Sequence, residues 1–348
     1  MKPTVVPPYL LARIVEAGDR FDHAARAARV GLDEWRSFAG VRGRPLEAPR
    51  TARPTRASGP DRRVSDAGGG DALPGRRVRS EGDPATGDVA VDEAWDGLGA
   101  TYAFFADAFG RDSIDGAGLP LEATVHYRRD YDNAFWDGER MVFGDGDGEV
   151  FGRFTASLSV IGHELAHGVT QYTTALEYQG QSGALNEHVS DVLGALVEQH
   201  AAGQTADEAT WLIGAGLFTD AVQGVALRSL AAPGTAYDDD VLGRDPQPAH
   251  LDDYVVTDED AGGVHLNSGI PNKAFHLVAT ALGGRAWERA GRIWWDAITA
   301  GTVTPTTDFA GFAAATLEAA TARYGVDSDE ARAVTDGWAG VGLPLVGA

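Results

Sequence analysis

Three residues in one short stretch have types and spacing suited to metal-assisted hydrolysis. His163, Glu164 and His167 follow the pattern His-Glu-x-x-His. Residues four apart share one face of a helix, so both imidazoles can reach one cation while the Glu164 carboxylate lies beside it. Apolar residues recur around the motif with a helical period, which predicts a buried helix. The stretch therefore predicts a zinc site with a general base next to it.

A second helical run, which begins about twenty residues later, supplies the remaining groups that such a site needs. A catalytic zinc takes three protein ligands and keeps one position open for water, and His, His and Glu is a known set. Glu187 is the expected third ligand. Asp191, one turn further on, can accept the second ring N–H of a ligand histidine and fix its tautomer, and Asn186 is a second candidate for supporting the ligands.

Several motifs, taken together and in order, resemble the thermolysin-like zinc metalloproteases. They are HELAHGVT, the spacing from it to NEHVSD, NAFWDG at 133–138 and GGVHLNSGIPNKA at 262–274. The likeness runs from about Val91 to the C-terminus. The short head before it carries Pro7-Pro8-Tyr9 and is similar to the propeptides of the protealysin-like branch. Such a head is implied to block the active-site cleft until it is removed.

The resemblance implies roles for residues around the reacting bond. Glu164 would take a proton from the zinc-bound water and deliver it to the leaving amine. His265 and Tyr178 would donate hydrogen bonds to the oxyanion, and Asp260 would keep His265 oriented and protonated. Without this context, a histidine that follows two glycines is more often a turn residue.

The resemblance also implies which residues hold the substrate. Asn133 and the backbone of Ala134 would bind its main chain on a sheet edge, where an extended peptide can add as a further strand. Arg228 would bond a substrate carbonyl on the leaving-group side. The pocket for the residue after the cut would be lined by three apolar side chains, Val160, Ile213 and Leu227. For these three, packing in the core is about as strongly favoured as contact with a substrate.

These features predict an α+β, two-domain thermolysin-like fold with the zinc helix between a β-rich N-terminal domain and a mostly helical C-terminal domain. The predicted units are a small helical propeptide at 1–50, a flexible linker with the maturation region at 51–75, and catalytic subdomains at 76–168 and 169–348. Helical periods are expected at 211–219 among other segments of the last unit. An Arg-, Pro- and Gly-rich composition favours the linker.

Composition narrows the class of protein and its partners. The chain has 348 residues, no cysteine and a net charge of −22, and no apolar run long enough to span a bilayer. Residues 1–82 carry 16 Lys and Arg against 10 Asp and Glu, whereas residues 83–348 carry 13 against 41. This asymmetry favours a head that docks electrostatically over one that binds nucleic acid, and no membrane partner is expected. The expected partners are protein or peptide substrates and the chain's own propeptide.

The start of the chain is a poor secretory signal, which leaves a cytoplasmic location or export by a non-classical route, although relatives of this family are often secreted. Many relatives bind a pair of calcium ions through carboxylates. Here Ser159 stands at one such position and residues 211–216 offer none, so the paired calcium site is expected to be absent.

Three functions compete on this sequence. They are a zinc endopeptidase made as a zymogen that cuts before hydrophobic residues, an inactive zinc-binding homologue that acts as a binding module, and a different zinc hydrolase. Every catalytic position is filled, which favours the endopeptidase over the binding module. Asn133 and Arg228 suit a peptide main chain, which favours it over the other hydrolase.

Overall fold

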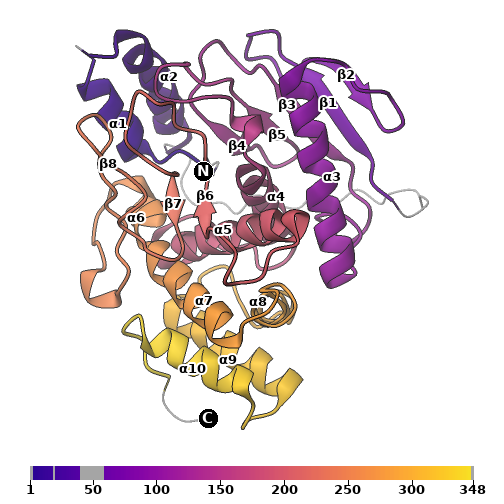
Figure 1. Ribbon diagram of the computed structural model, residues 1–348, viewed down its shortest axis with the longest axis vertical. Helices are drawn as coiled ribbons and strands as arrows, with labels where there is room; N and C mark the ends of the chain where they lie inside the picture. Colours follow the sequence, from indigo (N-terminus) through magenta and orange to yellow (C-terminus); the bar gives the residue numbers. More distant parts are fainter. Residues whose placement is uncertain (1–2, 19, 40–58, 346–348) are drawn as a thin grey trace.

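A five-stranded sheet dominates the upper part of the molecule in Figure 1, and a group of helices dominates the lower part. The computed structural model describes residues 3–18, 20–39 and 59–345. The sheet strands are β1 (Arg62–Asp66), β2 (Arg76–Ser80), β3 (Leu121–Val125), β4 (Ala134–Trp136) and β5 (Met141–Phe143). The helices after the head are α3 (Val89–Phe109), α4 (Leu158–Tyr172), α5 (Gly180–Ala202), α6 (Asp260–Asn267), α7 (Gly269–Leu282), α8 (Ala290–Thr299), α9 (Phe309–Tyr324) and α10 (Asp329–Ala339).

Short elements complete the connections between α5 and α6. They are β6 (Leu212–Ile213) paired with β7 (Arg228–Ser229), β8 (Asp238–Asp239) paired with β9 (Gly243–Arg244), and a 3-10 turn at Leu251–Asp253; another such turn, Phe154–Ala156, precedes α4. The predicted combination of a sheet-containing domain and a helical C-terminal domain, joined at the zinc helix, is confirmed.

The sheet order β2-β1-β3-β5-β4 places β4 at an edge. Strands β1, β3 and β5 run parallel, and β4 runs antiparallel to β5 with Ala134 opposite Phe143. The three residues of β4 are all buried, although an edge strand has no sheet neighbour on its outer side. That outer side is covered by the start of the chain, where Thr4 forms an antiparallel bridge with Phe135.

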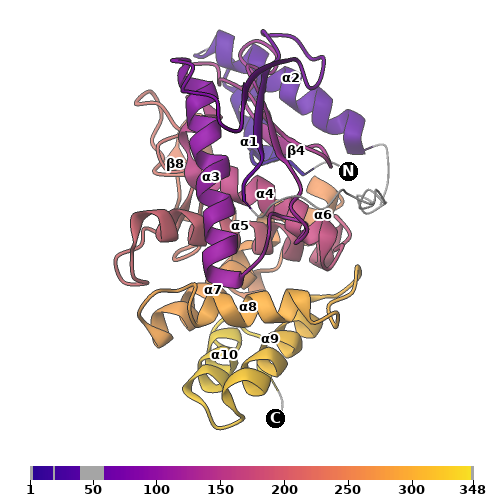
Figure 2. The ribbon, with the colours of Figure 1, turned by 90° about the vertical axis from the view of Figure 1, so that its right-hand side faces the viewer.

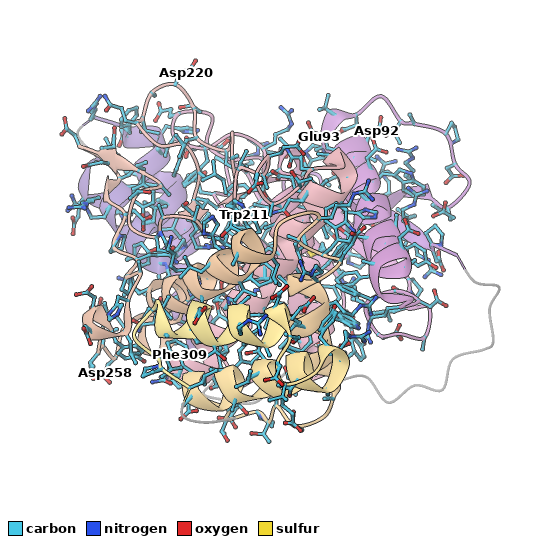
Figure 3. The ribbon with its side chains drawn as sticks, turned by 60° about the horizontal axis from the view of Figure 1, so that its bottom comes forward. Asp92, Glu93, Trp211, Asp220, Asp258 and Phe309 are labelled. Carbon is cyan, nitrogen blue, oxygen red and sulfur yellow. The ribbon has the colours of Figure 1, made fainter. Side chains whose placement is uncertain are left out.

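Helix α3 lies along the sheet and reaches from the strand β1 to the C-terminal helix α8 (Figure 2). Its first turn is capped by Asp88, whose carboxylate accepts the backbone N–H groups of Ala90 and Val91. Two acidic side chains near this end, Asp92 and Glu93 in Figure 3, form ion pairs with Arg79 at 2.8 Å and Arg153 at 2.9 Å. These contacts fix α3 against the strands and against the segment that leads into α4.

Helices α4 and α5 cross at a point where both carry glycine. A Cβ on Gly194 of α5 would lie 2.5 Å from the carbonyl oxygen of Ser159 on α4, and a Cβ on Gly162 would lie 3.0 Å from the Cα of Gly194. Larger residues at these positions would force the helices apart. The close approach brings side chains of α5 within reach of those on α4.

The head consists of α1 (Pro8–Glu16) and α2 (Asp22–Ala39), which lie beside the loop that carries β8 (Figure 1). It docks mainly through apolar side chains: Val5, Val6, Leu10, Leu11 and Ile14 are fully buried. Its polar contacts to the body include an acidic group, since Tyr127 donates a hydrogen bond to Glu34 at 2.9 Å. Most of the basic excess of residues 1–82 falls at 40–58, outside the described residues, so electrostatic docking stays a prediction.

Two sequence-based expectations require correction. Of the linker predicted at 51–75, residues 51–58 lie outside the described residues. The rest is not a flexible linker, because it contains β1, which pairs with β2 and β3. The polar sequence of β1 concealed a strand because Arg62 and Arg63 are paired with Glu81 and Asp61 at the sheet surface. Residues 211–219, expected to be helical, contain β6 and left-handed residues at Trp211, Gly214 and Gly216, which end any helix.

Within the described residues, no helix has both the length and the apolar character that a membrane span requires.

Two carboxyl groups are buried together beside the edge strand. Asp132, directly before Asn133, is fully buried, and Asp147 is 7% exposed. One carboxylate oxygen of Asp147 accepts the backbone N–H groups of Glu149 and Val150, so the glycine-rich loop at 144–149 is a turn fixed by its own aspartate. Burial, followed by the neighbouring Asp147, raises the pKa of Asp132 well above that of a free carboxyl group.

Replacing Asp132 with Asn should stabilise the protein, and this gain in stability should grow as pH rises. A carboxyl group with a raised folded-state pKa contributes stability below its unfolded pKa and loses it as pH rises through the folded pKa. In a Glu164→Ala background that prevents autolysis, we expect Asp132→Asn to raise the free energy of unfolding by about 1–3 kcal/mol at pH 8 and by less at pH 5. Urea unfolding at both pH values measures this.

The matched control is Asp130→Asn, because Asp130 is half exposed and pairs with His23 at the surface. It should change the free energy of unfolding little at either pH. A gain for Asp132→Asn that is no larger at pH 8 than at pH 5 would contradict the raised pKa.

Candidate active site

The two histidines on α4 and Glu187 on α5 converge on one point. The Nε2 atoms of His163 and His167 lie 3.1 Å apart, and the two carboxylate oxygens of Glu187 lie 3.5 Å from the first and 3.4 Å from the second. All three side chains are buried. Among the described residues they form the one group of three or more His, Cys, Asp or Glu that could hold a metal ion.

The contacts of the second ring nitrogens, Nδ1, leave both Nε2 atoms available to a cation. Nδ1 of His163 lies 2.8 Å from Asp191, and Nδ1 of His167 lies 2.8 Å from the side-chain oxygen of Asn186. Both partners are acceptors, so each Nδ1 carries a proton and each Nε2 presents a lone pair. Burial lowers the pKa of His167 to about 3, which keeps this imidazole neutral at neutral pH. Two facing lone pairs and a carboxylate fit zinc.

Asp191 connects the zinc ligands to Arg228. Its carboxylate contacts His163, accepts two hydrogen bonds from the Arg228 guanidinium at 2.8 and 3.0 Å, and accepts one from Asn272 at 2.8 Å. Burial alone would raise the pKa of Asp191, but Arg228 and His163 hold it well below its usual range. The carboxylate therefore stays charged in the interior and fixes both neighbours.

Glu164 faces the same space from α4. Its Oε2 accepts the backbone N–H of Trp136 at 2.8 Å, and its Oε1 is buried without a hydrogen-bond partner in the described part of the chain. Burial and then Glu187 raise the pKa of Glu164 well above its usual value. A buried carboxylate with one bound and one free oxygen, beside a cation site, is suited to exchange a proton with a water molecule.

His265 and Tyr178 approach from the opposite side. The Nδ1 of His265 lies 2.6 Å from Asp260, its Nε2 lies 3.2 Å from the Tyr178 hydroxyl, and that hydroxyl donates a hydrogen bond to Glu187. Burial opposes the charged form of His265, yet Asp260 and Glu187 raise its pKa to about 9. His265 therefore presents an N–H donor toward the centre.

A left-handed turn sets the orientation of Asp260 and His265. Asp260, Ala261, Gly262 and Gly263 all have φ between 49° and 84° at the start of α6. Glycine adopts this conformation freely, whereas each other residue is strained by about 1–2 kcal/mol. The turn lets both carboxylate oxygens of Asp260 bind His265, one at the ring and one at the backbone N–H, 2.8 Å away.

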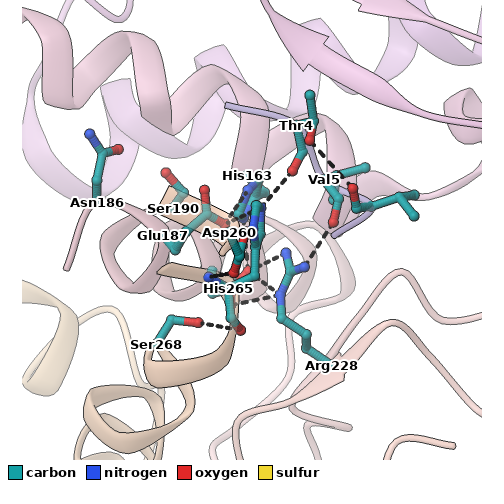
Figure 4. A network of polar contacts seen from close by, with 12 residues as sticks. Thr4, Val5, His163, Asn186, Glu187, Ser190, Arg228, Asp260, His265 and Ser268 are labelled. Carbon is teal, nitrogen blue, oxygen red and sulfur yellow. Dashed lines mark hydrogen bonds and ion pairs between the residues drawn. The ribbon is translucent and has the colours of Figure 1, made fainter. Parts of the chain in front are cut away.

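The start of the chain lies across this site (Figure 4). The carbonyl oxygen of Thr4 accepts from His265 Nε2 at 2.8 Å, and that of Val5 accepts from Arg228 at 2.8 Å. The Val5 N–H donates to the carbonyl of Ala134 at 3.0 Å. The Asn133 amide accepts from the N–H of Val6 at 2.9 Å and donates to its carbonyl at 3.2 Å.

The predicted site residues thus come together around one extended segment. Val160, Ile213 and Leu227 are all buried in the hydrophobic core that includes Val5. Ile213 and Arg228 are paired across β6 and β7, which brings Arg228 next to this apolar group.

Comparison with known families places the chain among proteases. Residues 65–171 match the catalytic domain of the thermolysin metallopeptidases, and residues 174–343 match their α-helical domain. The chain belongs to the thermolysin family. Its structure is similar to that of the protealysin precursor, a metalloproteinase from Serratia proteamaculans, with a TM-score of 0.89 and 50% identity over 98% of this chain and 99% of that one.

Relatives of this thermolysin-family chain carry protease names. An extracellular metalloprotease of Pectobacterium carotovorum is 50% identical over 98% of this chain and 96% of its own length. A thermolysin of Alicyclobacillus acidocaldarius is 39% identical over 74% of this chain, which corresponds to 46% of that protein. The similarity to a protease precursor includes the head, so this thermolysin-family enzyme is a metalloendopeptidase made as a zymogen.

Several site residues of this thermolysin-family enzyme were not predicted from its sequence. Trp136 supports Glu164 through its backbone, and Asn272 bonds both Asp191 and His188, which in turn accepts from Trp294 at 2.8 Å. These partners lie far apart in sequence. The segment Thr4–Val6 did carry a signal: β-branched residues directly before Pro7-Pro8 favour an extended backbone.

Replacing Asp191 with Asn should weaken zinc binding while leaving the three ligands in place. The variant removes the charge that orients His163 and leaves Arg228 buried without its counter-ion. We expect zinc affinity to fall about 10- to 100-fold, as for other partners of ligand histidines. Competition with a chromogenic chelator measures it.

The control is Asn186→Asp, which keeps an acceptor 2.8 Å from His167 Nδ1 and should hold zinc affinity within a few-fold of the wild type. Unchanged zinc affinity in a folded Asp191→Asn protein would argue against this role of Asp191.

Proposed function

We propose that this enzyme cleaves peptide bonds on the amino side of hydrophobic residues, and that Thr4–Val6 occupies the cleft as a peptide substrate does. The observation that supports this most strongly is the set of five hydrogen bonds from Asn133, Ala134, Arg228 and His265 to the backbone of that segment. They contact main-chain atoms, which any extended peptide offers.

The ligands His163, His167 and Glu187 fit zinc, which lowers the pKa of its bound water and polarises a carbonyl group. Glu164 takes a proton from the attacking water through its unpartnered Oε1 and delivers it to the leaving nitrogen. The N–H of Trp136 holds the other oxygen and so fixes the direction of the carboxylate.

His265 and Tyr178 act on the oxygen of the scissile carbonyl. The contact of His265 Nε2 with the Thr4 carbonyl supports this assignment, because a donor that binds the ground-state oxygen lies near the position where negative charge develops. Asp260 keeps His265 protonated and oriented through its two contacts. The Tyr178 hydroxyl lies 3.2 Å from the same nitrogen and donates to Glu187 here, so it would turn its proton from Glu187 to this oxygen as charge develops there.

Arg228 and the side chains around it select the residue after the cut. Arg228 bonds the carbonyl of Val5, and Asp191 holds the guanidinium in place. Val160, Ile213 and Leu227 are proposed to contact the side chain at this position, since all three are buried and Leu227 and Ile213 adjoin Arg228 in the chain and in the strand pairing. Burial of such a side chain contributes roughly 1.5–3 kcal/mol, which supports a hydrophobic preference.

A catalytic rather than a merely binding role is tested with an internally quenched peptide that carries Leu or Phe after the scissile bond. The zinc-loaded enzyme should cleave it only after the head has been removed by limited proteolysis. Glu164→Ala should lower kcat by at least about a thousandfold because the proton transfer is lost, with zinc content unchanged. Chelation should abolish cleavage and added zinc should restore it.

Glu139→Ala is the matched control, since this exposed carboxylate pairs with Arg140 away from the site and its loss should leave kcat unchanged. A folded, zinc-loaded and head-free enzyme that does not cleave would overturn the protease function and favour the binding module.

The cleft contacts support a proposal about partners, and the names of relatives support one about location. The proposed partners are peptides and proteins that can present an extended segment, and neither nucleic acid nor membrane is proposed to bind. The names of relatives as extracellular proteases support action outside the producing cell.

We further propose that the paired calcium site of many relatives is absent. The hydroxyl of Ser159 accepts the backbone N–H of Gly214 at 3.2 Å and contacts Ser157, so it ties α4 directly to the residues after β6. One neutral hydroxyl cannot replace the carboxylates that calcium prefers. Millimolar calcium should therefore leave the Tm of the zinc-loaded Glu164→Ala protein unchanged within about 1 °C, measured by calorimetry. Two tightly bound calcium ions in a calorimetric titration would contradict this proposal.

A further inference from the structure

The contacts of Thr4–Val6 define a register in which one peptide bond lies at the reaction centre. The carbonyl of Thr4 contacts His265, while the carbonyl of the next residue, Val5, contacts Arg228. The following residue, Val6, is held at both its N–H and its carbonyl by Asn133. The chain direction is fixed by these three successive contacts, so the bond between Thr4 and Val5 lies between the oxyanion donors and the leaving-group clamp.

The leaving nitrogen of that bond is bound by β4, the strand that also holds the proposed proton donor. The Val5 N–H is bound by the Ala134 carbonyl at 3.0 Å. Two residues further along the same strand, the N–H of Trp136 donates to the Glu164 carboxylate at 2.8 Å. A general acid must lie within reach of the atom that it protonates. The Thr4 carbonyl therefore meets an oxyanion donor, and the Val5 nitrogen is held on the strand that positions Glu164.

We propose that the Thr4–Val5 peptide bond is a substrate of this chain's own active centre, and that its cleavage leaves the head bound. This inference rests on the proposed function. It differs from release of the head, which requires a second cut between α2 and β1.

The step is an ordinary hydrolysis. The oxygen of one water molecule bonds to the carbonyl carbon of Thr4, and Glu164 takes a proton from that water. The bond between the Thr4 carbon and the Val5 nitrogen then breaks with its electrons on nitrogen, which receives the proton from Glu164. The products are a peptide that ends in the Thr4 carboxylate and a chain that begins with the Val5 amine.

Several contacts would keep the new amino terminus in the cleft. Its charge lies beside the Ala134 carbonyl, and the contacts of Arg228 with Val5 and of Asn133 with Val6 do not involve the broken bond. Leu10, Leu11 and Ile14 of α1 remain buried against the body. The head would then act as a bound product that no longer offers a scissile bond.

The test follows the N-terminus of the full chain. The protein is purified with chelator, zinc is added, and intact mass and N-terminal sequencing are followed with time. We expect a new N-terminus at Val5, at a rate independent of protein concentration, and none in Glu164→Ala. The product should gain no activity on the quenched peptide until the head is removed. Activity that appears together with the Val5 terminus would overturn the claim that the head stays bound.

A substitution in the register provides the matched comparison. Val5→Asp places a charge among buried apolar side chains and should abolish this cut, whereas Arg26→Gln, on the exposed face of α2, should leave its rate unchanged. If Val5→Asp is cleaved at the same bond and rate as the wild type, the register is wrong.

A second readout does not depend on turnover. In the Glu164→Ala chain, hydrogen exchange at the amides of Val5 and Val6 should be slow with or without zinc, because both are hydrogen-bonded in the cleft. Val5→Asp should accelerate it by at least about tenfold. Fast exchange in the parent Glu164→Ala chain would exclude this register.

The two proposals fail differently. A Thr4–Val5 bond that stays intact in a zinc-loaded chain, whose head-free form cleaves the quenched peptide, overturns this inference alone. An intact bond together with no cleavage by the head-free form overturns the protease function as well.

Discussion

The rest of the site depends on the contacts of the Asp191 carboxylate. It is fully buried, and it holds His163, a residue of the candidate zinc site, and Arg228, which binds the Val5 carbonyl, at the same time. An isolated buried charge would be strongly unfavourable, but a bidentate guanidinium and an amide donor from Asn272 compensate it. Because one group orients both, the candidate metal site and the guanidinium that binds the Val5 carbonyl keep a fixed separation.

The edge strand β4 explains why a substrate and the head compete for one place. An unpaired strand edge presents backbone donors and acceptors that favour a further strand. Here the head supplies that strand, and Thr4 pairs with Phe135 of β4. The head already occupies Asn133 and Ala134, the groups proposed above to bind a substrate, so under that proposal the two compete for one edge.

The sequence predicted the parts of the site that depend on local spacing or on motifs. Residues four apart on a helix identified His163 and His167, whereas Glu187 and His265 came from motifs; Glu187 lies on α5, and His265 follows a left-handed turn that was not predicted. Contacts between distant segments were not predictable, such as Trp294 with His188 or Asn272 with Asp191. Strand β1 was missed because its partly buried arginines are paired with acidic neighbours and conceal the alternation that usually marks a strand.

Covalent attachment of the head decides how the enzyme must be activated. The head and the cleft belong to one chain, so a head that leaves the cleft stays at a high effective concentration and returns rather than diffusing away. The apolar side chains of α1 and the hydrogen bonds of Val5 and Val6 favour that return. A weaker head would only raise the fraction of open molecules, whereas a break in the chain after α2 removes the tether. Loss of the head by proteolysis is therefore the step that separates the inactive from the active enzyme.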